Sequence, residues 1–146
     1  MFHFKWDFKM HWVAIGAVLS VSSPLVASDT LFDQMGGMDA MKRIAARTID
    51  LSAADARIAD EFRLVKLGRV KEKLALQFCE LTGGPCKYDG DPMKPLHKPM
   101  KLTTADFNAL VEAAQQAMRE EGIPFRLQNK LVAILAPLHK EIVTVK

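Results

Sequence analysis

The residues with the most reactive side chains gather in one stretch, FCELTGGPCKYDGDPMKPLHK, which spans residues 78–98. It holds both cysteines of the chain, Cys79 and Cys86, and one of its four histidines, His97. The six residues between the cysteines include a glycine pair, which lets the chain reverse sharply. This spacing predicts a disulfide that contributes about 2.5 kcal/mol by loop closure. A zinc site would need more closely spaced cysteines and further ligands.

The first 28 residues have the three parts of a secretory signal. Lys5 and Lys9 precede the apolar run WVAIGAVLSV, and small residues follow at Ala27 and Ser28. A membrane anchor is the alternative, but a spanning helix needs about 20 apolar residues, and residues 12–27 are sixteen with three serines and a proline. We therefore predict a signal peptide over residues 1–28, cleaved after Ala27 or Ser28, and a single domain over residues 29–146.

Export of this kind predicts a periplasmic or secreted protein with no stable membrane insertion after cleavage. An oxidising compartment also favours the disulfide between the two cysteines. Two histidines, His97 and His139, remain after the signal is removed.

The elements that must position these residues are helices, and no convincing strand pattern occurs, so we predict an all-α fold class. Thr30 with Asp33, and Thr103 with Asp106, have the spacing of capping boxes. They indicate a very short helix stopped by a glycine pair and a long helix over about residues 102–121.

Apolar residues at helical spacing predict three further segments. One helix begins near Asp39, a second lies between residues 64 and 81, and the last runs past Pro137, which should kink it. The loop between the second and the long capped helix is rich in glycine and proline. Pro92 can begin a single turn there, and His97 then lies at its end.

Composition excludes several function classes. The chain has 146 residues, of which 49% are hydrophobic and 25% charged, as in a globular domain with a real core. Twenty Lys and Arg against seventeen Asp and Glu is a small excess, and basic residues do not interleave with aromatic ones. Nucleic acid is therefore not an expected partner. No residues are spaced as an activated nucleophile or a catalytic carboxylate pair, so catalysis by side chains alone has little support.

The stretches LFDQMGGMDAMKRI, LTGGP, YDGDPMKPLHK, DFNALV and EGIPFRLQNKLVAILAPL follow one another between about Leu31 and Val143. In these stretches and in their order the chain resembles the group 1 truncated haemoglobins. This resemblance implies a two-on-two helical sandwich, a non-covalent haem b and binding of oxygen or another diatomic gas at the haem iron. Nitric oxide or redox chemistry at the haem, with an unidentified redox partner, stays open.

The resemblance also implies which residues contact the haem. The apolar residues expected to line its pocket, which could equally be plain core, are Phe62, Val70, Leu74, Phe78, Met93, Leu96 and Phe107. Lys73 matches a family residue that pairs with a haem propionate.

The same comparison implies three departures. Asp106 occupies the position that we assign to the family's proximal histidine, although a carboxylate there also suits the start of a capped helix. Ile49 and Leu74 stand where a tyrosine and a glutamine are typical on the distal side. Bound dioxygen would then lack hydrogen-bond donors.

We predict His97 as the axial iron ligand, because it matches a family histidine and ends a proline-bounded turn. Met93 and Met100 are alternative ligands, and His139 is expected at a solvated helix end. Two functions follow: an exported haem protein that binds diatomic gas, or a haem-free globin fold that serves as an interaction or structural protein.

Overall fold

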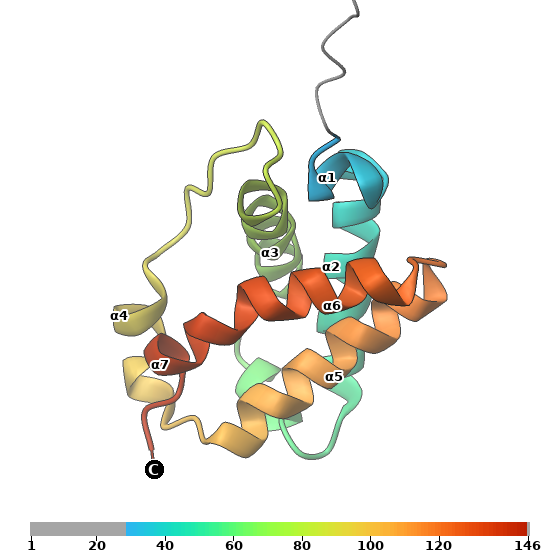
Figure 1. The fold of residues 1–146 in the computed structure, drawn as a ribbon. Coiled ribbons are helices and arrows are strands. Elements are labelled where there is room, and N and C mark those ends of the chain that lie inside the picture. The colour runs from blue at the N-terminus through green and yellow to red at the C-terminus, as the bar shows by residue number, and fades with distance from the viewer. Residues whose placement is uncertain (1–28, 146) are drawn as a thin grey trace, which may run out of the picture.

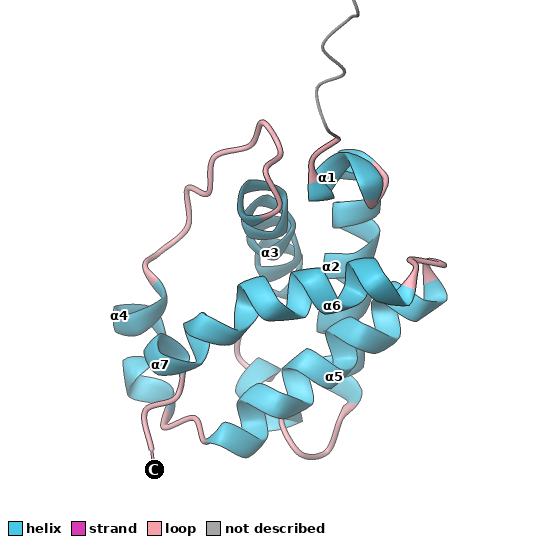
Figure 2. Ribbon diagram, in the orientation of Figure 1, coloured by secondary structure: helices cyan, strands magenta, loops and turns pink. Residues whose placement is uncertain are grey.

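The structure is a computed structural model, and it describes residues 29–145. The predicted signal peptide lies outside the described residues. The helices and 3-10 turns, in chain order, are α1 (Leu31–Gln34), α2 (Gly37–Ala54), η1 (Ala59–Phe62), α3 (Leu67–Leu81), α4 (Met93–His97), η2 (Lys98–Met100), α5 (Thr104–Glu120), α6 (Phe125–Leu135), η3 (Ala136–Leu138) and α7 (His139–Ile142). No strand occurs in this range, which confirms the all-α class (Figure 2).

Two helix pairs make the body of the fold. Helix α2 packs on α3 and on α5, and α5 packs on α6, so that α2 links the two pairs (Figure 1). The core lies between them, and its largest fully buried side chains include Phe78, Met35, Met41, Ile44 and Leu131. None of the helices in the described part of the chain is long and apolar enough to cross a membrane.

Both predicted capping boxes are present. The Thr30 hydroxyl accepts from the Asp33 backbone N–H, and the Asp33 carboxylate accepts from the Thr30 backbone N–H, at the start of α1. Thr103 and Asp106 make the same pair of bonds at the start of α5. These bonds satisfy backbone donors that an uncapped helix would leave free, so the sequence itself sets where the two helices begin.

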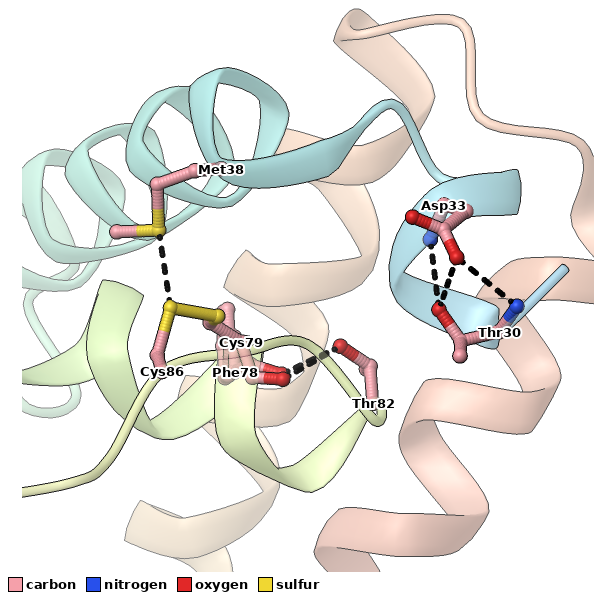
Figure 3. The surroundings of a disulfide bond; sticks show 7 residues. All are labelled: Thr30, Asp33, Met38, Phe78, Cys79, Thr82 and Cys86. Atoms are coloured by element: carbon pink, nitrogen blue, oxygen red, sulfur yellow. Dashed lines mark hydrogen bonds between the residues drawn. A yellow bond between two sulfur atoms is a disulfide. The ribbon is translucent and has the colours of Figure 1, made fainter.

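The predicted disulfide joins Cys79, in the last turn of α3, to Cys86 in the following loop (Figure 3). Cys79 is fully buried, and the Cys86 sulfur lies 3.6 Å from the Met38 sulfur. A Cβ at Gly84 would come within 2.6 Å of the Cys79 sulfur and 2.7 Å of the Phe32 ring. Glycine is therefore required where the chain turns between the cysteines.

The last predicted helix is broken rather than kinked. Pro137 lies in the 3-10 turn η3, which separates α6 from the short α7. Because proline has no backbone N–H to donate, the α-helical hydrogen-bond pattern stops there. The new direction brings α7 against α4 and α5 (Figure 1).

Candidate functional site

An apolar cavity of about 430 Å³ lies among α2, α3, α4, α5 and α7. This volume is within the usual range for a site that holds a small molecule. Ile49 comes from α2, whereas Leu74 comes from α3, Met93 from α4, Phe107 from α5 and Ile142 from α7. The cavity therefore depends on tertiary packing and not on any single segment.

His97 lines the cavity from the last residue of α4. Its Nδ1 lies 2.8 Å from the backbone oxygen of Met93, one turn earlier. A carbonyl oxygen can only accept, so Nδ1 carries a proton, and in the neutral ring the free lone pair is then on Nε2. A neutral imidazole in this tautomer is suited to binding a metal ion.

No group of three or more His, Cys, Asp or Glu side chains in the described residues could hold a bare metal ion. A metal at His97 would therefore need most of its ligands from another source, such as a porphyrin.

Aliphatic side chains of α2 and α3 form one surface of the cavity. Ile49 is 2% exposed, and Val70 and Leu74 lie one turn apart on α3. Ile58, just before η1, and Phe62, its last residue, extend this surface. It offers van der Waals contact and no polar group of its own.

Cationic side chains from α3 and the residue before it lie at the cavity's edge. Lys66 and Arg69 line the cavity and are otherwise exposed. The Lys73 ammonium bonds the Asp89 carboxylate at 2.7 Å, and this hydrogen bond is the main reason why the pKa of Asp89 is lowered. Tyr88 also lines the cavity, and burial raises the pKa of its hydroxyl.

Asp106 also lines the cavity, but its side chain caps α5. Its Oδ2 accepts from the Thr103 backbone N–H and from the Thr103 hydroxyl, each at 2.7 Å. The carboxylate is therefore occupied at the helix start and does not take the place of a metal-binding imidazole. His97, and not residue 106, supplies an imidazole to the cavity.

His139 lies elsewhere than the sequence suggests. Its ring packs edge-on against Phe107, with ring centroids 5.1 Å apart, and its Nε2 lies 3.1 Å from the Thr104 hydroxyl. It is half-buried and does not line the cavity, so the expected solvated helix end is wrong.

Nearly all the predicted pocket residues meet in this cavity. They are Phe62, Val70, Lys73, Leu74, Met93, Leu96 and Phe107, together with the predicted ligand His97. Phe78 is the exception, because its fully buried ring belongs to the hydrophobic core and does not line the cavity. The periodicity of α3 correctly indicates that Phe78 is buried but not what it packs against.

Several lining residues were not predicted from the sequence. They include Ile58, Val65, Gln77, Tyr88, Leu110 and Ile142. Leu110 lies one turn after Phe107 on α5, so helical spacing was a usable signal for it. Ile142 lies four residues after Leu138 on the apolar stripe of the last helical segment, so helical spacing was a usable signal for it too.

Comparisons with known proteins agree with the fold. The bacterial-like globin family matches residues 30–144. A group 1 truncated hemoglobin of Mycolicibacterium paratuberculosis is 27% identical over 115 residues, covering 79% of this chain and 85% of that protein. The group 1 truncated hemoglobin of Synechocystis is 28% identical over 116 residues, covering 76% of this chain and 94% of its own.

Solved structures give the same result for the fold. The truncated hemoglobin of Tetrahymena pyriformis superposes with a TM-score of 0.76 at 24% identity, covering 79% of this chain and 98% of that one. The 2/2 hemoglobin of Synechococcus, solved with covalently attached heme, has a TM-score of 0.72 at 19% identity, covering 80% and 98%. The predicted two-on-two sandwich is thereby confirmed.

Proposed function

Because the chain belongs to the bacterial-like globin family, among the group 1 truncated haemoglobins, we propose that it binds one non-covalent haem b in the cavity beside His97. The haem would supply an iron that takes up a diatomic gas. The observation that carries this proposal is the orientation of His97, whose Nδ1 is bonded to the Met93 carbonyl at 2.8 Å while the ring lines an apolar cavity.

The residues fit a haem in three respects. The apolar surfaces of α3, α4 and α5 suit a flat, largely apolar ring, and the cavity volume is of the size that a cofactor needs. Lys66, Arg69 and Lys73 bring positive charge to the edge where carboxylate groups of a ligand would meet solvent. Asp89 would compete for Lys73, since it already bonds that ammonium.

In this proposal His97 would hold the haem iron through Nε2. The Met93 carbonyl fixes the imidazole tautomer and increases the basicity of Nε2, as a second partner does for metal-binding histidines generally. Asp106 orders the start of α5, and Phe107 then follows it into the cavity wall. Asp106 therefore does not have to serve as an iron ligand.

Titration of the haem-free protein with haemin tests the proposal. We expect a Soret band that saturates at one haem per chain and changes after reduction under carbon monoxide. Val70→Trp fills the cavity and should weaken uptake by about 10-fold or more. The control is Leu76→Trp, a half-buried position on the same helix that does not line the cavity and should bind as the wild type does.

A protein that develops no saturable Soret band would instead support the alternative, a haem-free globin fold that acts as an interaction or structural protein. Equal loss of uptake in Val70→Trp and Leu76→Trp would mean that the cavity is not where haem binds.

We propose, in addition, that the protein is exported and processed near Ala27 or Ser28. The charged, apolar and small-residue parts of the leader support this, and so does a disulfide of a kind that persists in oxidising compartments. Intact mass spectrometry of the protein from whole cells is the test. A species that begins near residue 28 or 29 is expected, and a dominant species that retains Met1 would refute the proposal.

A further inference from the structure

The cavity contains two chemically different surfaces. His97 is on α4, whereas α2 and α3 contribute the aliphatic residues Ile49, Val70 and Leu74. We propose that this aliphatic surface makes the site discriminate against dioxygen, in favour of diatomic ligands that need no hydrogen-bond donor, such as carbon monoxide and nitric oxide. The inference rests on the proposed haem binding and names its ligand class.

The hydroxyl groups nearest to Ile49 along α2 are both turned away. Thr48 and Ser52 are fully buried, but the Thr48 hydroxyl donates to the Ile44 carbonyl at 2.7 Å and the Ser52 hydroxyl donates to the Thr48 carbonyl at 2.8 Å. Each hydroxyl has one proton, so neither has a second to offer a ligand. Neither residue lines the cavity.

Two polar side chains that line the cavity, Gln77 and Tyr88, each donate one hydrogen bond to another part of the cavity wall. Gln77 donates through Nε2 to the Met93 sulfur at 3.4 Å, which ties α3 to α4. The Tyr88 hydroxyl donates to the Asp91 backbone oxygen at 3.0 Å.

Two of the charged groups that line the cavity are also bonded to other residues. The Lys73 ammonium is bonded to Asp89 at 2.7 Å, and the Asp106 carboxylate only accepts and caps α5. Lys66 and Arg69 line the cavity but are exposed to solvent. Ile49, Val70 and Leu74 therefore form a surface without any side-chain donor of its own. Gln77 and Lys73, two cavity-lining donors of α3 that flank Leu74 in sequence, each have one N–H bonded to another residue.

Donors affect diatomic ligands unequally. Bound dioxygen becomes strongly polar and is retained by a nearby N–H or O–H, whereas bound carbon monoxide is much less polar, and distal polarity is a main control on what a haem site binds. A hydrogen bond to a charged or strongly polar group changes an equilibrium by about 10- to 100-fold. We expect dioxygen to leave this site faster by that factor than it would with a donor present.

Leu74→Gln tests the inference, because glutamine has nearly the size of leucine and adds a donor at a half-buried, cavity-lining position. The control Leu74→Met keeps the size and adds no donor. Flash photolysis and stopped-flow mixing of the haem-loaded proteins give the dissociation rates. Dioxygen dissociation should slow by about 10- to 100-fold in Leu74→Gln, with little change for carbon monoxide and none of this slowing in Leu74→Met.

The infrared stretching frequency of bound carbon monoxide gives a readout independent of rates. It should lie in the range of an apolar site in the wild type and Leu74→Met, and shift toward that of a polar site in Leu74→Gln. If Leu74→Gln fails to fold, Val70→Asn places an amide with two N–H donors at the neighbouring cavity position.

The outcomes separate this inference from the proposed function. A protein that takes up no haem overturns both. A protein that binds haem and carbon monoxide but retains dioxygen tightly overturns this inference alone. Faster dioxygen loss in Gln77→Leu would identify Gln77 as a donor and would also overturn it.

Discussion

The two sides of the cavity differ in how the chain supports them. On one side, α2 buries Met41, Ile44, Thr48 and Ile49 in the core, and α3 packs against it. On the other side, which carries His97, no residue between Thr82 and Leu102 is buried. One side is an extension of the core, and the other is a long exposed segment that runs from α3 to α5 (Figure 1) and contributes lining residues to the cavity.

A few specific bonds and contacts hold the exposed side in place. Its beginning is fixed to α3 by the disulfide and by the bond between Lys73 and Asp89. Its end is fixed at Leu102, whose carbonyl accepts from the backbone N–H groups of Thr144 and Val145, near the C-terminus of the chain. Between these points α4 packs against α7.

This difference separates two properties that a haem site needs. The side that would meet the gas is set by core packing, so its apolar character is as well fixed as the fold itself. The side that would supply the ligand depends on a few local bonds and on the haem. Haem stabilises the folded state because it binds the folded chain and not the unfolded one. Substitutions on the two sides should therefore affect different measurements.

Truncation of matched apolar residues should give the largest contrast. Phe78→Ala, on the buried face of α3, is expected to lower the free energy of unfolding of the haem-free protein by about 3–5 kcal/mol. Leu96→Ala, on α4, should lower it by less than about 0.5 kcal/mol, because Leu96 is 43% exposed. Urea denaturation followed by circular dichroism measures both.

Haem affinity, unlike the stability of the haem-free protein, should depend on Leu96, because Leu96 lines the cavity. Leu96→Ala is expected to weaken haemin binding while leaving the haem-free fold intact. Comparable losses of stability in Phe78→Ala and Leu96→Ala would mean that the exposed side is as much a part of the core as α3.

Removal of the disulfide should release the beginning of the exposed side. The Cys79→Ser, Cys86→Ser double variant is expected to lose about 2.5 kcal/mol, or about 10 °C in Tm. Haem should also leave faster, as measured by its transfer to an excess of a haem-scavenging globin. An unchanged Tm would show that α3 and the loop are already held together without the bond.

Lys101 offers a smaller change in the stabilising direction. It has φ 55° and ψ 38°, a left-handed conformation that costs a side-chain-bearing residue about 1 kcal/mol relative to glycine. Lys101→Gly should therefore raise Tm by about 2–4 °C. The control is Lys98→Gly, at φ −50° in right-handed backbone, which should lower Tm slightly. A lower Tm in both variants would mean that the left-handed conformation of Lys101 does not destabilise the protein.

The ion pair at the cavity's edge should have the smallest effect, visible mainly in pH dependence. The hydrogen bond from Lys73 keeps the pKa of Asp89 below its usual value. The stabilisation is therefore complete above the ordinary carboxyl pKa of about 3.9 and is lost as pH falls through the lower folded-state value. In an NMR titration, Lys73→Met should raise the pKa of Asp89 toward the ordinary value, and no change would mean that Lys73 does not hold it.

The sequence predicted the parts of this molecule that depend on local chemistry. Thr30 with Asp33 and Thr103 with Asp106 cap helices as expected, and His97 ends a short turn after Pro92. The cysteine spacing gave the correct disulfide, because a loop with a glycine pair can close.

The parts that depend on tertiary packing were not predictable in this way. Phe78 shares a helical face with Leu74, yet Leu74 meets the cavity and Phe78 the core, since one helix passes from one environment to the other along its length. His139 was expected in solvent, but the break at Pro137 turns its ring onto Phe107. Helical periodicity gives the buried face of a helix and not the neighbour that covers it.

The central claim is that His97 provides the axial nitrogen from the exposed side of the cavity, and resonance Raman spectroscopy of the ferrous haem protein tests it most directly. In protein labelled with ¹⁵N-histidine, the iron–nitrogen stretching mode should shift in the wild type and in His139→Ala. In His97→Gly the mode should vanish, and unlabelled imidazole should restore it without the isotope shift. A label-sensitive iron–nitrogen mode that persists in His97→Gly would contradict the account.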